Sequence, residues 1–139
     1  MFLTIDGFES MTPQQIFDLS AKHMLTTKKK SVSDNGLCVY SGIGCAASVF
    51  LKDDEARRYC DALNPDAAEG KPSSESGWES LVNLGLAPKE HLQLLMALQI
   101  THDGLDGSED DVFFSTWLKS IRNIARSSEL DASILDQGE

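Results

Sequence analysis

Apolar residues recur at helical spacing along most of the chain, and the first such stretch has a clear beginning. Thr12-Pro13-Gln14-Gln15 places a threonine at the N-cap, a proline at the first helical position and a glutamine at the third, a combination typical of a capping box. Ile16, Leu19 and His23 then lie on one stripe, so we predict a helix over residues 13–26. The apolar stretch before it, Phe2–Ile5, predicts a short strand or an arm packed on the core.

Three short helical segments are predicted in the middle of the chain. Cys45–Leu51 is largely apolar and predicts a short buried helix. Asp53 or Asp54 would cap the next helix, and a third, around Trp78, should end at Gly85 because glycine favours the left-handed backbone that closes a helix. The inward residues expected on the second and third helices are Ala56, Tyr59, Cys60 and Leu63, and Trp78, Leu81 and Val82.

Two longer helices are predicted towards the end of the chain. The first should begin at Ala87-Pro88 and end near 101–104, and the second should follow the acidic turn of residues 106–111, where negative charge favours a helix start. A last turn around 130–135 either docks or frays. The inward residues expected are Leu92, Leu95, Met96 and Gln99 on the first helix, and Val112, Phe113, Trp117, Leu118, Ile121 and Ala125 on the second.

One short segment has the alternation of a strand. Leu37–Tyr40 lies between the turn sequences Asn35-Gly36 and Ser41-Gly42, and residues 30–32 could pair with it as a hairpin. Residues 64–76 hold prolines, a glycine, serines and acids, a composition typical of a loop. We therefore predict a mainly α (α+β) fold, with five to six helices and a small two-stranded β element near 30–41. It would form a single compact domain over 1–139, with a flexible loop at about 64–76.

The net charge of −10 is confined to one part of the chain. Residues 1–50 hold four acids and four bases, whereas residues 51–139 hold eighteen acids and eight bases. Such a surface repels a phosphate backbone, which makes direct nucleic-acid binding unfavourable, and it suits a partner with a basic surface. No apolar run is long enough to span a bilayer, and the first residues lack the features of a secretory signal. We expect a cytoplasmic protein with reduced cysteines and no membrane contact.

Cys45 is the residue with the clearest catalytic potential. It follows Gly-Ile-Gly at the start of a predicted helix, where the helix dipole lowers the pKa of a thiol. His102, oriented by Asp103, could serve as its general base, and His23 is the alternative histidine. A Cys–His hydrolase using Cys45, His102 and Asp103 is therefore one alternative, although a buried structural cysteine is favoured.

A second alternative is a structural zinc site. His23, Cys38, Cys45 and His102 would supply a Cys₂His₂ ligand set, but six residues separate the two cysteines, more than in compact zinc modules. We therefore expect no metal and no other cofactor.

Two blocks of the sequence show a resemblance to known proteins. The first contains the Gly36-x-Cys38-x-Tyr40-x-Gly42 segment followed by Cys45-Ala46, and the second is a leucine-rich helix ending in Gln99-x-x-His102-Asp103. Together they resemble a group of short uncharacterised proteins from bacteriophages and prophages. The resemblance implies a mobile-element protein acting inside a bacterial cell, and it implies no particular activity.

These observations favour a small acidic accessory protein of a phage or mobile element that binds another protein without catalysis. The expected partner is a host bacterial protein or complex with a basic surface. Occluding that surface would inhibit a defence or nucleic-acid-handling complex. The expected contact residues are Asp106, Glu109, Asp110 and Asp111. The sequence leaves open the oligomeric state and any role of the 64–76 loop.

Overall fold

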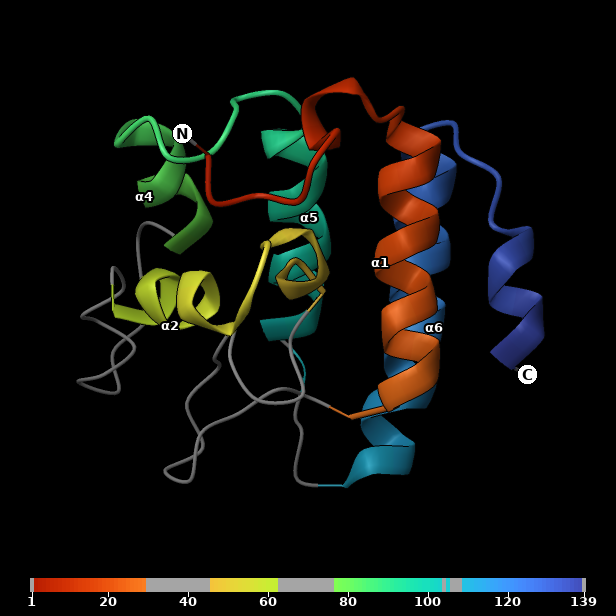
Figure 1. The fold of residues 1–139 in the computed structure, drawn as a ribbon. Helices are drawn as coiled ribbons and strands as arrows, with labels where there is room; N and C mark the ends of the chain where they lie inside the picture. The colour runs from red at the N-terminus through yellow and green to blue at the C-terminus, as the bar shows by residue number, and fades with distance from the viewer. Residues whose placement is uncertain (1, 30–45, 63–76, 104, 106–108, 139) are drawn as a thin grey trace.

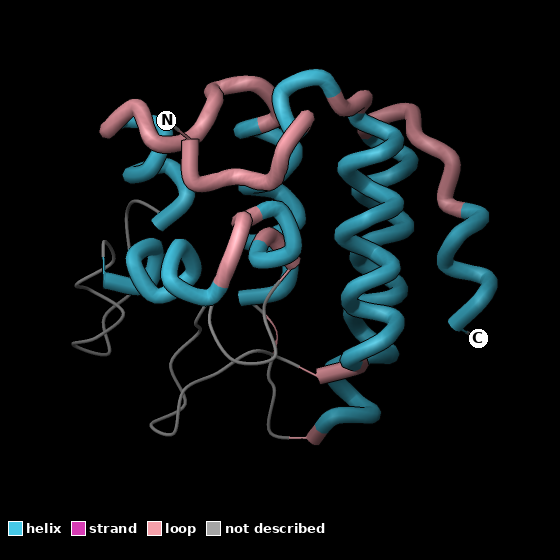
Figure 2. Tube along the Cα trace, viewed as in Figure 1, coloured by secondary structure: helices cyan, strands magenta, loops and turns pink. Residues whose placement is uncertain are grey.

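The computed structural model describes residues 2–29, 46–62, 77–103, 105 and 109–138, and this part of the chain is mainly helical (Figures 1 and 2). The α-helices are α1 (Pro13–Thr27), α2 (Asp54–Ala62), α4 (Gly77–Asn83), α5 (Leu92–Asp103) and α6 (Asp110–Ser127). Three short 3₁₀ helices accompany them: η1 (Phe8–Ser10), η2 (Ser48–Phe50) and η3 (Ser133–Gly138). The two-stranded element predicted near 30–41 and the loop predicted at 64–76 lie outside the described residues.

Helix α1 begins as its sequence predicts. The backbone N–H of Gln15 donates to the Thr12 hydroxyl at 3.1 Å, and the backbone N–H of Thr12 donates to the Gln15 side chain at 2.8 Å. These two bonds form a complete capping box, with Pro13 in the first turn. Ile16, Phe17, Ser20, Ala21 and Met24 form the buried face of this helix.

Helices α1 and α6 run antiparallel and are linked near both ends. At the start of α1, the Gln14 side chain donates to the backbone carbonyl of Asp131 at 2.9 Å, just beyond α6. At the other end, the Lys28 ammonium lies 5.3 Å from the centre of the Phe114 ring. Helix α5 contacts both α1 and α6, and η3 packs against α1, so the last turn of the chain is docked. The buried face of α6 consists of Phe113, Trp117, Ile121 and Ala125, as predicted, whereas Val112 is 54% exposed.

The N-terminal arm and residues 50–52 lie side by side. The Ile5 N–H donates to the Phe50 carbonyl at 2.9 Å, and the Lys52 N–H donates to the Leu3 carbonyl at 2.9 Å. On the other side of the arm, the Leu3 N–H donates to the Leu86 carbonyl at 2.7 Å. The resulting bridge between Thr4 and Leu51 is the β-pairing found among the described residues. The arm is therefore anchored by backbone hydrogen bonds on two sides.

Three local predictions need correction. Residues 46–51 are buried as expected except for half-buried Val49, but they form a turn and the 3₁₀ helix η2, because residue 51 leaves helical geometry to pair with the arm. Helix α5 begins at Leu92 and not at Ala87-Pro88, because His91 has a φ of 69°, a left-handed conformation that a right-handed helix cannot include. In α2, Ala56 and Cys60 are buried as predicted, but Tyr59 is 44% exposed.

The buried apolar residues form one cluster that draws on every described helix. Its largest members include Phe8, Phe17, Phe50, Trp78 and Trp117. Helix α4 ends at Asn83, and Gly85 closes it just beyond that residue, as predicted, in a left-handed conformation with φ of 75°. The helices thus surround one core, and segment 46–52 enters it between α1, α2 and α5 (Figure 1).

Candidate functional site

The start of α6 presents a run of exposed acids. Glu109 precedes the helix, Asp110 and Asp111 occupy its first turn, and all three are exposed. Carboxylates at this place are stabilised by the partial positive charge of a helix N-terminus. The structure therefore supports the predicted exposure of Glu109, Asp110 and Asp111, while Asp106 lies outside the described residues. We call Glu109, Asp110 and Asp111 the acidic start of α6.

The end of α1 lies next to the acidic start of α6. Lys29 forms an ion pair with Asp110 at 3.8 Å, and both side chains are more than half exposed. Lys28, which has a left-handed backbone at φ 55°, directs its ammonium towards Phe114. An exposed pair of this length contributes little to stability, roughly 0–1 kcal/mol. A basic partner can therefore compete with Lys29 for Asp110 at small cost.

Of the residues considered for Cys–His hydrolysis, the structure describes His23, His102 and the backbone of Asp103. His102 is fully buried near the end of α5, and its ring meets the edge of Phe113 with the ring centres 5.7 Å apart. Asp103 is the last residue of α5. Cys45 lies outside the described residues. In the described part of the chain, His102 is a residue of the packed interior.

The zinc hypothesis involves the same histidine. His102 is buried and His23 is half-buried on α1, while Cys38 and Cys45 are not among the residues described. Within the described ranges, no group of three or more histidine, cysteine or acidic side chains is arranged to hold a metal ion.

A buried polar cluster surrounds residues 46–48, and the sequence analysis did not predict it. The Ser20 hydroxyl donates to the Ala46 carbonyl at 2.6 Å, and the Ala47 N–H donates to the Gln99 side-chain oxygen at 3.3 Å. Arg57 donates through Nε to the carbonyl of residue 48 at 3.1 Å. Side chains from α1, α5 and α2 thus hold three consecutive backbone groups.

The sequences of two helices contain an indication of this cluster. Ser20 and Gln99 are polar residues within otherwise apolar faces, and a buried polar group requires a hydrogen-bond partner. The sequence does not identify that partner, because it is a backbone group 26 residues away in one case and 52 in the other. Since these bonds satisfy backbone groups, the cluster explains how the segment is held and does not itself indicate a reaction.

Comparisons with known protein families, with curated proteins and with solved structures find no match for this chain. Among the helices in the described ranges, none is both long enough and apolar enough to cross a bilayer.

Proposed function

We propose that this protein binds, without catalysis, to a partner protein whose contact surface is rich in lysine and arginine. The observation that supports this proposal is the exposure of three consecutive acids at the start of α6. Val112 follows them directly and is 54% exposed, so an apolar contact lies beside the charged one. Interfaces commonly combine a polar rim with such apolar contacts.

The distribution of charge supports a basic partner. All of the net charge of −10 comes from residues 51–139, which include the acidic start of α6. Complementary charge accelerates association and disfavours partners of like charge. Nucleic acid is itself negatively charged, so a protein that holds nucleic acid has the basic surface that this chain suits.

The resemblance to short bacteriophage and prophage proteins suggests where such a partner would be found. In this proposal the chain acts in the cytoplasm of a bacterial host. It inhibits a defence complex or a nucleic-acid-handling complex by covering the basic surface that normally contacts nucleic acid. The chain would then act as a competitor for that surface and would need no cofactor.

The test compares three versions of the protein as bait in host lysate, with bound proteins quantified by mass spectrometry. They are the wild type, the triple variant Glu109→Lys, Asp110→Lys, Asp111→Lys, and a control of equal charge change. The control reverses Glu9, Glu90 and Glu129, which are exposed acids away from the start of α6. We expect a specific partner to be retained by the wild type and the control and lost by the triple variant. Added DNA should displace it.

Folding must be measured in the same samples, because acids in the first turn also stabilise α6, each by roughly 0.3–1 kcal/mol. Circular dichroism should show that the triple variant remains folded at the assay temperature. A partner that the folded triple variant and the wild type capture equally at low salt would exclude the acidic start of α6 as the contact. Partners lost equally by both variants would indicate an effect of total charge alone.

A further inference from the structure

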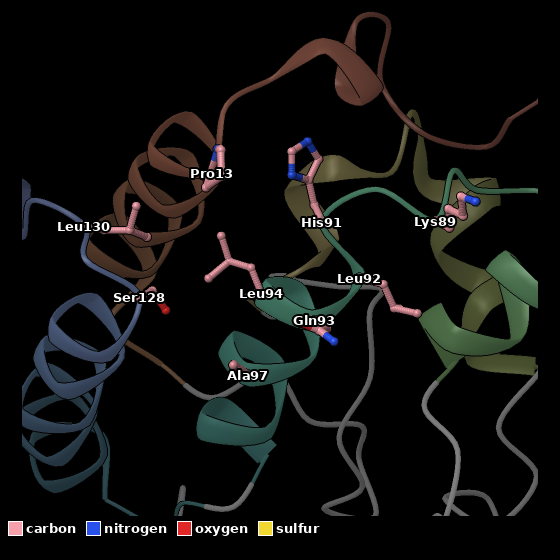
Figure 3. A pocket seen from close by; sticks show the side chains of 9 residues that line it. All are labelled: Pro13, Lys89, His91, Leu92, Gln93, Leu94, Ala97, Ser128 and Leu130. Atoms are coloured by element: carbon pink, nitrogen blue, oxygen red, sulfur yellow. The ribbon is translucent and has the colours of Figure 1, made fainter.

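An open hollow of about 630 Å³ lies at the start of α5. It extends across the first turn of that helix, from Lys89 on one side to Pro13, Ser128 and Leu130 on the other (Figure 3). Leu94 points across the hollow towards Pro13 and Leu130 (Figure 3). Its volume falls within the range of about 300–1,000 Å³ that is usual for small-molecule sites.

The charge of this hollow is opposite to that of the molecule as a whole. Lys89 is the charged residue of its lining, and none of the described residues that line it carries a carboxylate. The chain as a whole has 22 acids and 12 lysines and arginines. A second hollow of about 370 Å³, beside α2, has Lys52 together with Asp53 and Glu55. The α5 hollow therefore lacks the carboxylates that line the hollow beside α2.

The remaining lining of the α5 hollow is mainly apolar. Its described apolar members are Pro13, Leu92, Leu94, Ala97 and Leu130. Gln93 and Ser128 add neutral polar groups. Lys89, the charged residue of this lining, lies at one end of the hollow, and Pro13, Leu94 and Leu130 lie at the other, so the hollow has a cationic end and an apolar end (Figure 3). A ligand matching this division carries a negative charge at one end and an apolar chain at the other.

His91 shapes the cationic end. Its backbone has a φ of 69°, and its ring packs edge-on against Phe8 with the ring centres 5.5 Å apart. The left-handed backbone prevents α5 from extending back towards Pro88, so the helix begins beside the hollow. Strained backbone of this kind is often found at binding sites. The start of α5 adds a weak partial positive charge to that of Lys89.

We propose that this hollow binds a small amphiphilic carboxylate, with its head group beside Lys89 and its apolar chain across Leu94, Ala97 and Leu130. The charge complementarity of a cationic end in an acidic protein supports this occupant over a neutral or cationic one. Glu90 and Glu129 adjoin lining residues in the sequence but are not part of the lining. The proposal is independent of the partner-binding function.

The test uses decanoate as the probe, with decanol and decylamine as comparisons of equal chain length, each below the concentration at which it aggregates. Two-dimensional NMR of the full chain should show decanoate shifting the amide signals of residues 92–97 and 128–130. Decanol and decylamine should bind at least several-fold more weakly. Lys89→Glu should weaken decanoate binding roughly three- to tenfold, as expected for the loss of one charge-assisted contact.

Two further variants keep the test specific. Ala97→Phe places a large side chain in the hollow and should abolish the shifts, while its spectrum reports whether the chain is folded. Lys119→Glu makes the same charge change as Lys89→Glu at an exposed position on α6 and should leave binding unchanged. Binding of decanol as tight as that of decanoate, or equal loss in the two lysine variants, would overturn the proposal. So would shifts confined to other parts of the chain.

Discussion

The two long helices and segment 46–52 are built on different principles. Helices α1 and α6 carry apolar residues at regular spacing, and their buried faces follow from that spacing. Segment 46–52 is held by hydrogen bonds from side chains of α1, α2 and α5 and from the backbone of the N-terminal arm. The helices thus depend mainly on apolar packing. The segment also contributes Phe50 and Leu51 to the core, but in addition it depends on the satisfaction of its polar backbone.

This difference has an energetic consequence. Apolar burial in a helix face is spread over several residues. Truncating one of these side chains leaves a cavity, and the loss of stability grows with the volume of that cavity. A buried backbone group that loses its only partner keeps its full desolvation cost. Loss of volume should therefore test the packing of the helices, and loss of a hydrogen bond at constant volume should test the feature that is particular to the segment.

The largest effect is expected from truncation in α6. Phe113 is buried and lies against the ring of His102, so Phe113→Ala should lower the free energy of unfolding by about 3–5 kcal/mol. Urea denaturation followed by circular dichroism measures this change. The neighbouring Val112 is 54% exposed, and Val112→Ala should cost less than about 0.5–1 kcal/mol. Similar losses at the two positions would show that the orientation of α6 differs from that described.

A smaller effect is expected where a hydrogen bond is removed at nearly constant volume. Gln99→Met leaves the Ala47 N–H without the acceptor that lies 3.3 Å away, and should cost about 1–3 kcal/mol. Gln93→Met on the same helix serves as the control, because Gln93 is exposed. Faster hydrogen exchange at the Ala47 amide in the Gln99→Met protein would identify the bond directly. Equal stability of the two variants would refute the role given to Gln99.

The same division explains what could be predicted from the sequence. The capping box at Thr12 and the face of α6 depend on residues within a few positions of one another. The capping box was confirmed, and the face of α6 was confirmed except at Val112, which is exposed. The start of α5 was placed too early, because Pro88 is a common first helical residue and nothing local indicated the left-handed backbone of His91. The contacts of Ser20 and Gln99 could not be predicted, because their partners are remote in the sequence.

The candidate sites show a similar contrast. The exposure of Glu109, Asp110 and Asp111 follows from their charge and could be predicted, whereas the partner they contact stays a prediction. The hollow at α5 combines Pro13, residues 89–97 and residues 128–130, three stretches that only the fold brings together. Its cationic end was not apparent in the sequence, because Lys89 and His91 lie next to Glu90, and only the geometry separates the lysine and histidine from that acid.

The smallest change in the free energy of unfolding is expected at the helix ends. It shows how far the end of a helix is determined by its own residues. Helices α4 and α6 end with the same pair of backbone hydrogen bonds. After α4, the N–H of Gly85 donates to the carbonyl of Val82, and the N–H of Leu86 donates to that of Leu81. After α6, the N–H of Glu129 donates to the carbonyl of Arg126, and the N–H of Leu130 donates to that of Ala125. Gly85 and Glu129 both have a left-handed backbone, with φ of 75° and 57°. This conformation strains any residue with a Cβ, so exposed Glu129→Gly should raise the free energy of unfolding by about 0.5–1 kcal/mol.

Gly85→Ala provides the reciprocal measurement. A Cβ at that position would meet no atom within 4 Å, so its cost of about 1 kcal/mol would come from the backbone conformation alone. Thermal unfolding of both variants should therefore give shifts of opposite sign and similar size. If Glu129→Gly is neutral while Gly85→Ala is destabilising, the end of α6 is held by the docking of residues 130–135, with Leu135 buried in the core. Tertiary contacts would then determine the end of α6, as they determine segment 46–52.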